Sequence, residues 1–155
     1  MHITLEADYA IRILDALNRD DRIEDAKHLA EQSRVTLRFT LKILHKLASG
    51  GLVRSYKGKG GGYCLAMPAK EITLYRVIEL IDGPVYVNRC LSGDGCHFEG
   101  NAVCGQGQCK YHLIFDDVNE KLVRALKKYT IASKRPNRPS DGVSRADGDL
   151  LAGQI

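Results

Sequence analysis

The distribution of charge along the chain restricts what it can fold into and bind. Positions 32–70 contain no Asp or Glu, whereas the first 31 residues are rich in acids. The modest net charge of +4 therefore conceals a basic block that follows an acidic segment. A block of one sign is typical of a surface that contacts a polyanion such as nucleic acid. Eight bases lie in it: Arg34, Arg38, Lys42, Lys46, Arg54, Lys57, Lys59 and Lys70.

Apolar periodicity predicts three helices and then a hairpin around this block. The first helix has apolar residues at helical spacing, and the second has Asp25 as a candidate N-cap. Two short strands flank a glycine-rich turn, which is the order of a winged helix-turn-helix. The expected fold is mainly α with a small β-hairpin wing. We predict helices over 7–18, from Asp25 to about Ser33, over 36–48, 74–81 (capped by Thr73) and 113–132, and strands over 52–56 and 63–66.

The third predicted helix has a basic face opposite an apolar one on a wheel of about 100° per residue. Leu37, Ile43, Leu44 and Leu47 lie on the apolar side, where they can pack on a core. The basic side and the wing predict a contact with the major groove and phosphates of double-stranded DNA. The alternative is a solvated amphipathic helix beside a flexible hairpin. The predicted DNA-binding residues are Arg34, Thr36, Arg38, Lys42, His45, Lys46, Arg54, Lys57 and Lys59.

Four of the five cysteines form a second cluster in the sequence. Cys90, Cys96, Cys104 and Cys109 lie in a Gly- and Asn-containing stretch without regular periodicity, and His112 follows. Thiolates are soft ligands that suit an iron–sulfur cluster or zinc, and the absence of a Cys-x-x-Cys pair counts against a zinc ribbon. The alternative is a set of free thiols. The fifth cysteine, Cys64, lies between apolar residues of a predicted strand and is expected to be a core thiol.

Several functional classes find no support in the sequence. No apolar run is long enough for a membrane span, and no secretory signal is visible at the N-terminus, so we expect a cytoplasmic protein with no membrane partner. Reduced cysteines are expected in that compartment. No Ser/His/Asp or paired-carboxylate pattern can be placed, which argues against an enzyme. Residues 133–155, which lack apolar periodicity until Leu150, are expected to form a flexible tail.

Four phrases of the sequence together resemble the IscR/NsrR group of winged-helix transcription regulators, the Rrf2 family. They are the opening Ile3-Thr4 through Asp8-Tyr9-Ala10, the phrase 51–55 (Gly-Leu-Val-Arg-Ser), the wing 58–63 (Gly-Lys-Gly-Gly-Gly-Tyr), and the cysteine stretch that leads into a long helix. The resemblance covers residues 1 to about 132. It implies a homodimer in which long C-terminal helices cross. The heptad-like residues Phe115, Val118, Leu122, Ala125 and Tyr129 are compatible with this, although such a stripe could equally be intramolecular core.

The resemblance also implies an iron–sulfur cluster held by three cysteines and one other residue. Cys90, Cys96, Cys109 and His112 match the IscR pattern, but the gap between Cys96 and Cys109 is longer than in that pattern and contains Cys104. Cys104 is therefore an alternative third ligand. In the branch that senses nitric oxide, an Asp from the other subunit is a ligand, and Asp8 occupies that position here. A [2Fe-2S] cluster is favoured by resemblance, with [4Fe-4S] as the alternative.

These expectations combine into one functional hypothesis with one rival. Residues 1–82 would form the DNA-binding winged helix-turn-helix, residues 83–132 the cluster-binding loop and dimerisation helix, and residues 133–155 the tail. The chain would be a transcriptional repressor whose operator binding depends on a cluster that senses iron–sulfur status, redox state or nitric oxide. The rival is a metal-free regulator in which Cys104 and a neighbouring thiol form a reversible disulfide.

Overall fold

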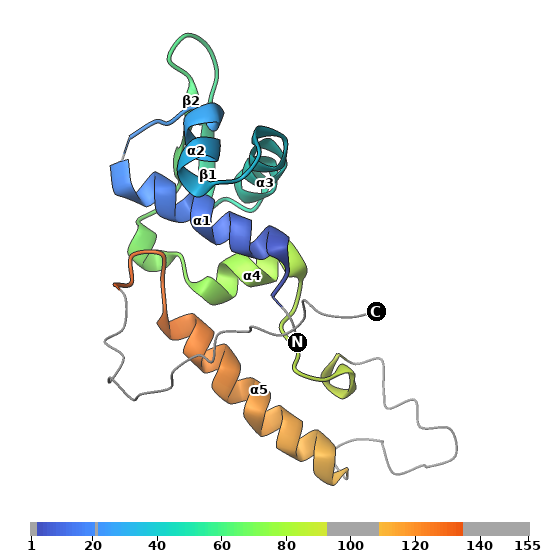
Figure 1. Ribbon diagram of the computed structural model, residues 1–155. Helices are drawn as coiled ribbons and strands as arrows, with labels where there is room; N and C mark the ends of the chain where they lie inside the picture. The colour runs from blue at the N-terminus through green and yellow to red at the C-terminus, as the bar shows by residue number, and fades with distance from the viewer. Residues whose placement is uncertain (1–2, 21, 93–108, 135–155) are drawn as a thin grey trace, which may run out of the picture.

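The computed structural model describes residues 3–20, 22–92 and 109–134 (Figure 1). This part of the chain is mainly helical and has one two-stranded antiparallel hairpin, which confirms the predicted fold class. None of its helices is long and apolar enough to cross a membrane. In chain order the elements are α1 (Leu5–Asp20), α2 (Ala26–Ser33), α3 (Leu37–Ser49), β1 (Val53–Tyr56), β2 (Gly62–Leu65), η1 (Ala69–Glu71), α4 (Leu74–Asp82), η2 (Arg89–Leu91) and α5 (Lys110–Lys128).

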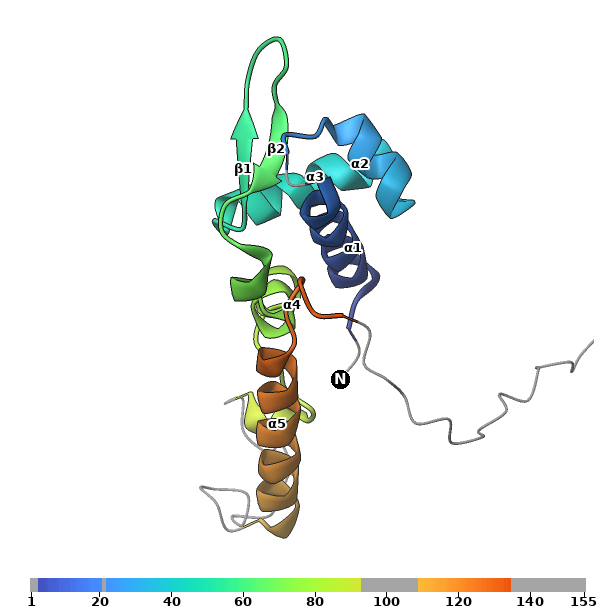
Figure 2. The same ribbon diagram turned by 90° about the vertical axis from the view of Figure 1, so that its left-hand side faces the viewer.

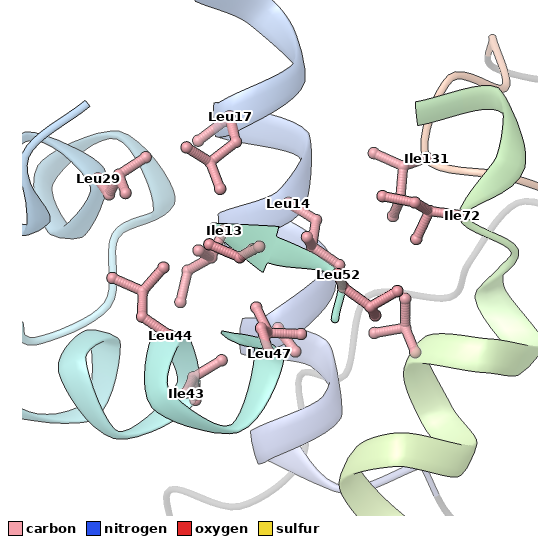
Figure 3. Packing of buried hydrophobic residues seen from close by; sticks show 14 of the residues in the cluster. Ile13, Leu14, Leu17, Leu29, Ile43, Leu44, Leu47, Leu52, Ile72 and Ile131 are labelled. Carbon is pink, nitrogen blue, oxygen red and sulfur yellow. The ribbon is translucent and has the colours of Figure 1, made fainter. Parts of the chain in front are cut away.

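The core lies where α1, α2 and α3 converge (Figure 3). The predicted stripe of α1 is confirmed, because Ala10, Ile13, Leu14 and Leu17 are all buried. They pack in one cluster with residues from the other two helices, the hairpin, the segment before α4 and the chain after α5. Each large aliphatic side chain buried in this way contributes about 1.5–3 kcal/mol to folding. The cluster also contains Leu29, Ile43, Leu44, Leu47, Leu52, Val53, Ile72, Val77 and Ile131.

Local capping sets the starts of α2 and α4 as predicted. The Asp25 carboxylate accepts hydrogen bonds from the backbone N–H groups of Lys27 and His28, at 2.8 and 2.9 Å. The His28 bond is the main reason that the pKa of Asp25 lies below its ordinary value. The Thr73 hydroxyl accepts from the Arg76 N–H at 3.2 Å. Both caps satisfy backbone donors that the first turn of a helix leaves unpaired.

The hairpin is attached to the helices by a third strand-like segment. Glu24, between α1 and α2, forms an antiparallel bridge with Tyr63 through N–H···O bonds of 2.8 and 2.9 Å. The backbones of Glu24 and Gly62 lie so close together that a Cβ on Gly62 would be 2.5 Å from the Glu24 carbonyl oxygen. Glycine is therefore required at this position by contact within the protein.

The expectation that Cys64 is a core thiol is wrong. Cys64 is half-buried, and its thiol donates to the Leu65 carbonyl oxygen at 3.4 Å. Its strand neighbours Tyr63 and Leu65 both pack against the core. Because side chains alternate between the two faces of a strand, Cys64 lies on the face opposite them.

The last helix begins and ends earlier than predicted. It spans Lys110–Lys128, and the chain that follows is extended because Thr130 forms a bridge with Thr73. The Leu74 N–H donates to Tyr129 O at 2.9 Å, and the Ile131 N–H donates to Ile72 O at 3.0 Å. These bonds bring Ile131 into the core. The wing and α5 lie at opposite ends of the molecule (Figures 1 and 2). Beyond Lys134 the predicted tail lies outside the described residues.

Candidate nucleic-acid interface and metal-ligand segment

A tight turn connects α2 to α3 and directs the start of α3. Arg34 occupies the left-handed region, with φ +56° and ψ +42°, and is the one non-glycine residue with positive φ in the described part of the chain. The Val35 N–H donates to Ala30 O at 3.0 Å and closes the end of α2. Glycine is the usual residue at this position because a side chain there costs conformational energy. The turn thus holds an exposed guanidinium beside the first turn of α3 at the expense of backbone strain.

The structure places the predicted basic residues on two neighbouring elements, α3 and the hairpin. Arg34, Thr36, Arg38, Lys42 and His45 are exposed, and Lys46 is half-buried. Arg54, Lys57 and Lys59 on the hairpin are exposed as well. Within the described residues, six of these bases form no ion pair: Arg34, Arg38, His45, Arg54, Lys57 and Lys59.

The other two bases of α3 are paired with an acid that the sequence analysis did not single out. Lys42 Nζ donates to Glu6 Oε2 at 3.2 Å, and Lys46 Nζ lies 2.8 Å from Glu6 Oε1. The Lys46 interaction, followed by that of Lys42, holds the pKa of the Glu6 carboxyl below its ordinary value against the opposing effect of burial. Lys42 and Glu6 are 36 positions apart, so local periodicity carries no signal for this contact.

The apolar face of α3 differs from prediction at two positions. Ile43, Leu44 and Leu47 are fully buried as expected, but Leu37 is 44% exposed. Leu37 lies about 100° from Arg38 on the wheel, at the border of the apolar face, and in the first turn of the helix. Thr40 is fully buried in its place. Its wheel position, about 160° from Arg38, gave a signal for burial that its polar type obscured.

The cysteine segment is described only at its two ends. Cys90 lies in η2, and Cys109 is the N-cap residue of α5; both thiols are free and half-buried. Cys96 and Cys104 lie outside the described residues. The part of the chain that is described contains no group of three or more His, Cys, Asp or Glu side chains that could hold a metal.

The donors that flank this segment suit a thiolate-ligated group. Cys109 and His112 are separated by three residues and therefore lie on one face of the first turn of α5. The Cys109 side chain makes no capping hydrogen bond to the backbone N–H groups of that turn. The positive end of the helix dipole also favours an anionic ligand there. η2 contacts α5, so Cys90 approaches the same helix.

Two sets of hydrogen bonds hold the chain that leads into the cysteine segment. The Val87 N–H donates to Asn119 Oδ1 in the middle of α5 at 3.1 Å. Earlier in the chain, the Asp82 carboxylate at the end of α4 accepts from the backbone N–H of Thr4 (3.0 Å) and from its hydroxyl. A cavity of about 390 Å³ is lined by Thr4 and Asp82 together with Arg89 of η2 and Ser92, which follows η2. The start of α1, the end of α4 and the Cys90 segment therefore form one joint.

The alternative ligand Asp8 has a local partner. Its carboxylate lies 2.8 Å from the Arg12 guanidinium, one turn later on α1, and both side chains are more than 40% exposed. An exposed pair of this kind contributes little to stability and leaves the carboxylate accessible to a second chain.

Comparison with known proteins gives consistent results. The profile of the Rrf2 family, described as an iron-dependent transcriptional regulator, matches residues 3–133. The HTH-type transcriptional regulator IscR of Yersinia pseudotuberculosis is 30% identical over 134 residues, which are 85% of this chain and 77% of that protein.

Solved structures show the same fold. CymR, the global cysteine regulator of B. subtilis, has a TM-score of 0.67 at 19% identity, over 84% of this chain and 93% of that one. An oxidized form of Staphylococcus aureus CymR has a TM-score of 0.60 at 21% identity, over 84% and 93%. At these identities the likeness concerns the fold alone.

Proposed function

The chain belongs to the Rrf2 family of DNA-binding transcriptional regulators, and from this premise we propose that an iron–sulfur cluster at its cysteine segment controls its binding to operator DNA. Membership in a family of regulators also means that the chain is not an enzyme. The observation that carries the proposal is the position of the cysteines: the segment begins at η2 and ends at the N-cap of α5, next to the joint with α1 and α4. We propose that the regulator acts as a repressor.

On the DNA side, α3 enters the major groove and the hairpin contacts the neighbouring backbone. Arg38 and His45 can reach base edges because they lie on the exposed face of α3. Lys57 and Lys59 at the exposed tip of the wing neutralise phosphates, and Arg34 and Thr36 do so at the start of α3. Arg54 continues this row on β1, and Lys42 and Lys46 extend it toward α1.

We propose that a second copy of the chain covers α5. The helix has 19 residues and none of them is buried, which is unusual for so long an element with apolar residues. Tyr111, Ile114 and Val118 are 66%, 47% and 45% exposed. They lie within about 60° of each other on the wheel. Half-buried Phe115 and Leu122 lie beside them, toward the side on which Asn119 holds the Val87 segment. A homodimer through α5 also gives the two recognition helices a defined spacing.

The proposed ligands are Cys90, Cys96, Cys109 and His112, with Cys104 and Asp8 of the other subunit as alternatives. Cys90 lies in η2, which contacts α5, and Cys109 and His112 lie at the N-cap and in the first turn of that helix. When bound, a [2Fe-2S] cluster, or a [4Fe-4S] cluster as the alternative, supplies a centre whose ligation changes with iron supply, oxidation or nitric oxide.

The residues around the segment can transmit such a change to the DNA-binding elements. Asn119 couples residue 87 to α5, and Asp82 couples the end of α4 to the first turn of α1. A rearrangement of residues 83–109 therefore acts on α5 and on α1 together. Because α1 packs on α3 and α5 is the proposed dimer element, the distance between the two recognition helices would change.

The second candidate is a metal-free thiol switch. The chain has four cysteines where three suffice as ligands, and Cys104 would be the additional thiol. The fold is shared with CymR of Staphylococcus aureus, which has been solved in an oxidized form. In this case a reversible disulfide within residues 90–109 would replace the cluster.

Anaerobic purification with UV-visible and Mössbauer spectroscopy tests the proposal and distinguishes the two cluster types. We expect a coloured, iron-containing protein whose affinity for double-stranded DNA changes when iron is removed. Cys90→Ser should abolish the colour, whereas Cys64→Ser, on the wing and outside the segment, should retain it. A colourless, iron-free protein whose DNA binding ignores iron but responds to dithiothreitol would support the thiol switch instead.

A further inference from the structure

Two lysines of the proposed recognition helix bind an acid of their own chain. The Glu6 carboxylate lies between Lys42 and Lys46, at 3.2 and 2.8 Å from their ammonium nitrogens, and each of its oxygens has one lysine. Both distances lie within the range of N–H···O hydrogen bonds, the kind of contact that an ammonium group makes with a DNA phosphate. We propose that Glu6 is an internal competitor for DNA phosphates that weakens binding and reduces its dependence on salt. The inference rests on the proposed placement of α3 at the DNA.

The exposure of the three side chains fits competition better than a purely structural ion pair. The Lys42 and Lys46 side chains are 54% and 38% exposed, and that of Glu6 is 25% exposed. The two ammonium groups are thus accessible to an anion from solvent while they contact the carboxylate. A phosphate that approaches them meets the negative charge of Glu6, so it must either displace the carboxylate or bind beside it.

The position of Glu6 is fixed by the start of α1. Thr4 caps this helix, because its hydroxyl accepts the Ala7 N–H at 3.2 Å, and Asp82 in turn holds Thr4. One turn later, Tyr9 contacts Phe39 of α3 edge-to-face, with ring centroids 6.3 Å apart. The carboxylate is therefore held beside α3 by the backbone of α1 rather than by the lysines alone. It stays close to them when DNA arrives.

The α1 residue Asp15 provides a matched control for Glu6. It is an acid on the same helix, it is ion-paired with Arg19 at 2.6 Å, and its removal changes the net charge by the same amount. Its partner lies on α1 and outside the proposed interface. Comparing Glu6→Gln with Asp15→Asn therefore separates competition at α3 from the general effect of one additional positive charge.

Fluorescence anisotropy with a labelled duplex of arbitrary sequence measures the effect, because the phosphate contribution does not depend on sequence. Between about 50 and 200 mM salt, we expect Glu6→Gln to bind about three- to tenfold more tightly than the parent, with the slope of log K against log salt steeper by about one. Asp15→Asn should change the affinity less than twofold. Equal effects of the two variants, or weaker binding by Glu6→Gln, would overturn the inference.

The double variant Lys42→Ala/Lys46→Ala separates this inference from the function on which it rests. If the lysines contact DNA, their loss weakens binding, and the gain from Glu6→Gln disappears in that background. If their loss weakens binding but Glu6→Gln produces no gain in the parent, only the role of Glu6 is wrong. If their loss has no effect, this face of α3 does not contact DNA, and the placement of α3 fails as well. Circular dichroism of each variant verifies that the helices are retained.

Discussion

The helical head and the C-terminal arm of this regulator differ in how many of their apolar side chains are buried. The head, residues 3–82, buries apolar residues from α1, α2, α3 and α4 in one cluster. The arm, formed by η2 and α5, contributes no buried residue from its long helix, and only the chain beyond it, at Ile131, enters the core. The head is therefore complete within one chain. The arm instead exposes apolar side chains that its own chain does not cover.

This difference explains where function depends on partners. In our proposal, DNA is bound by side chains that the head already exposes on α3 and the wing. The arm exposes apolar side chains and contains two free cysteines. In our proposal a second copy of the chain covers the apolar side chains, and an iron–sulfur cluster binds the cysteines. Regulation then consists of changing the arm while the head stays folded. Substitutions in the head and in the arm should therefore have separable effects.

The same substitution in the two regions should have very different consequences. Leu44→Ala removes a fully buried side chain of the head and should lower the free energy of unfolding by about 3 kcal/mol. Leu113→Ala removes a side chain of the arm that is 54% exposed, and should change it by less than about 0.5 kcal/mol. Urea unfolding at low protein concentration measures both.

The unfolding cost of Leu113→Ala shows whether α5 belongs to the core of its own chain. A cost for Leu113→Ala similar to that for Leu44→Ala would mean that α5 is folded into the core of its own chain. A small cost that does not depend on protein concentration would place Leu113 outside the core and outside the proposed dimer face, since it lies about 100° from Ile114 on the helix wheel.

A charge on the exposed face of α5 should disrupt self-association without unfolding the head. Ile114→Asp introduces a carboxylate beside Val118 and Tyr111, where burial against a second copy would leave it unpaired. We expect the dissociation constant of the dimer to rise at least about tenfold, or about 1.4 kcal/mol. Sedimentation velocity measures this change. Glu120→Lys, about 120° away on the helix and exposed, is the control and should leave the dimer intact.

The head was also the more predictable region, because its signals are local. The α1 stripe, the Asp25 and Thr73 caps and the glycine-rich turn are encoded within a few residues of where they act. The end of α5 was wrong by about one turn because it depends on Thr73, which is distant in sequence. No periodicity in residues 129–132 signals that partner. Cys64 was misplaced because the strand face was judged from its apolar neighbours rather than from alternation.

In the candidate site too, residues with a local sequence signal were predictable and those set by long-range packing were not. The exposed bases of α3 followed from a helical wheel, as did the burial of Ile43, Leu44 and Leu47, three of the four apolar residues predicted to face the core. Glu6 could not be found, because an ion pair between α1 and α3 depends on how two helices pack. The ligand set stays a prediction, since Cys96 and Cys104 lie outside the described residues.

Within the head, stability and DNA binding should respond oppositely at Arg34. Its left-handed backbone favours glycine, so Arg34→Gly should raise the free energy of unfolding by about 0.5–1 kcal/mol. The same change removes a proposed phosphate contact and should weaken DNA binding while making it less dependent on salt. Thermal unfolding and anisotropy test the two effects separately. A destabilised variant would show that the guanidinium has a structural partner; an unchanged affinity would exclude Arg34 from the interface.

The smallest effect concerns pH and again lies in the head. The pKa of Glu6 is lowered from its ordinary value of 4.5 by Lys46 and then Lys42, so its ion pairs stabilise the folded state above that pH and are lost as pH falls through the lower folded value. At pH 7 the parent should be more stable than Glu6→Gln by a few tenths to about 1 kcal/mol, as for other partly exposed pairs. The two proteins should converge in acid. Asp25, whose pKa is also lowered, is present in both and cancels in the difference. A difference that persists unchanged in acid, where the carboxyl is protonated in the folded and the unfolded state, would mean that Glu6 stabilises α1 by packing instead of by charge.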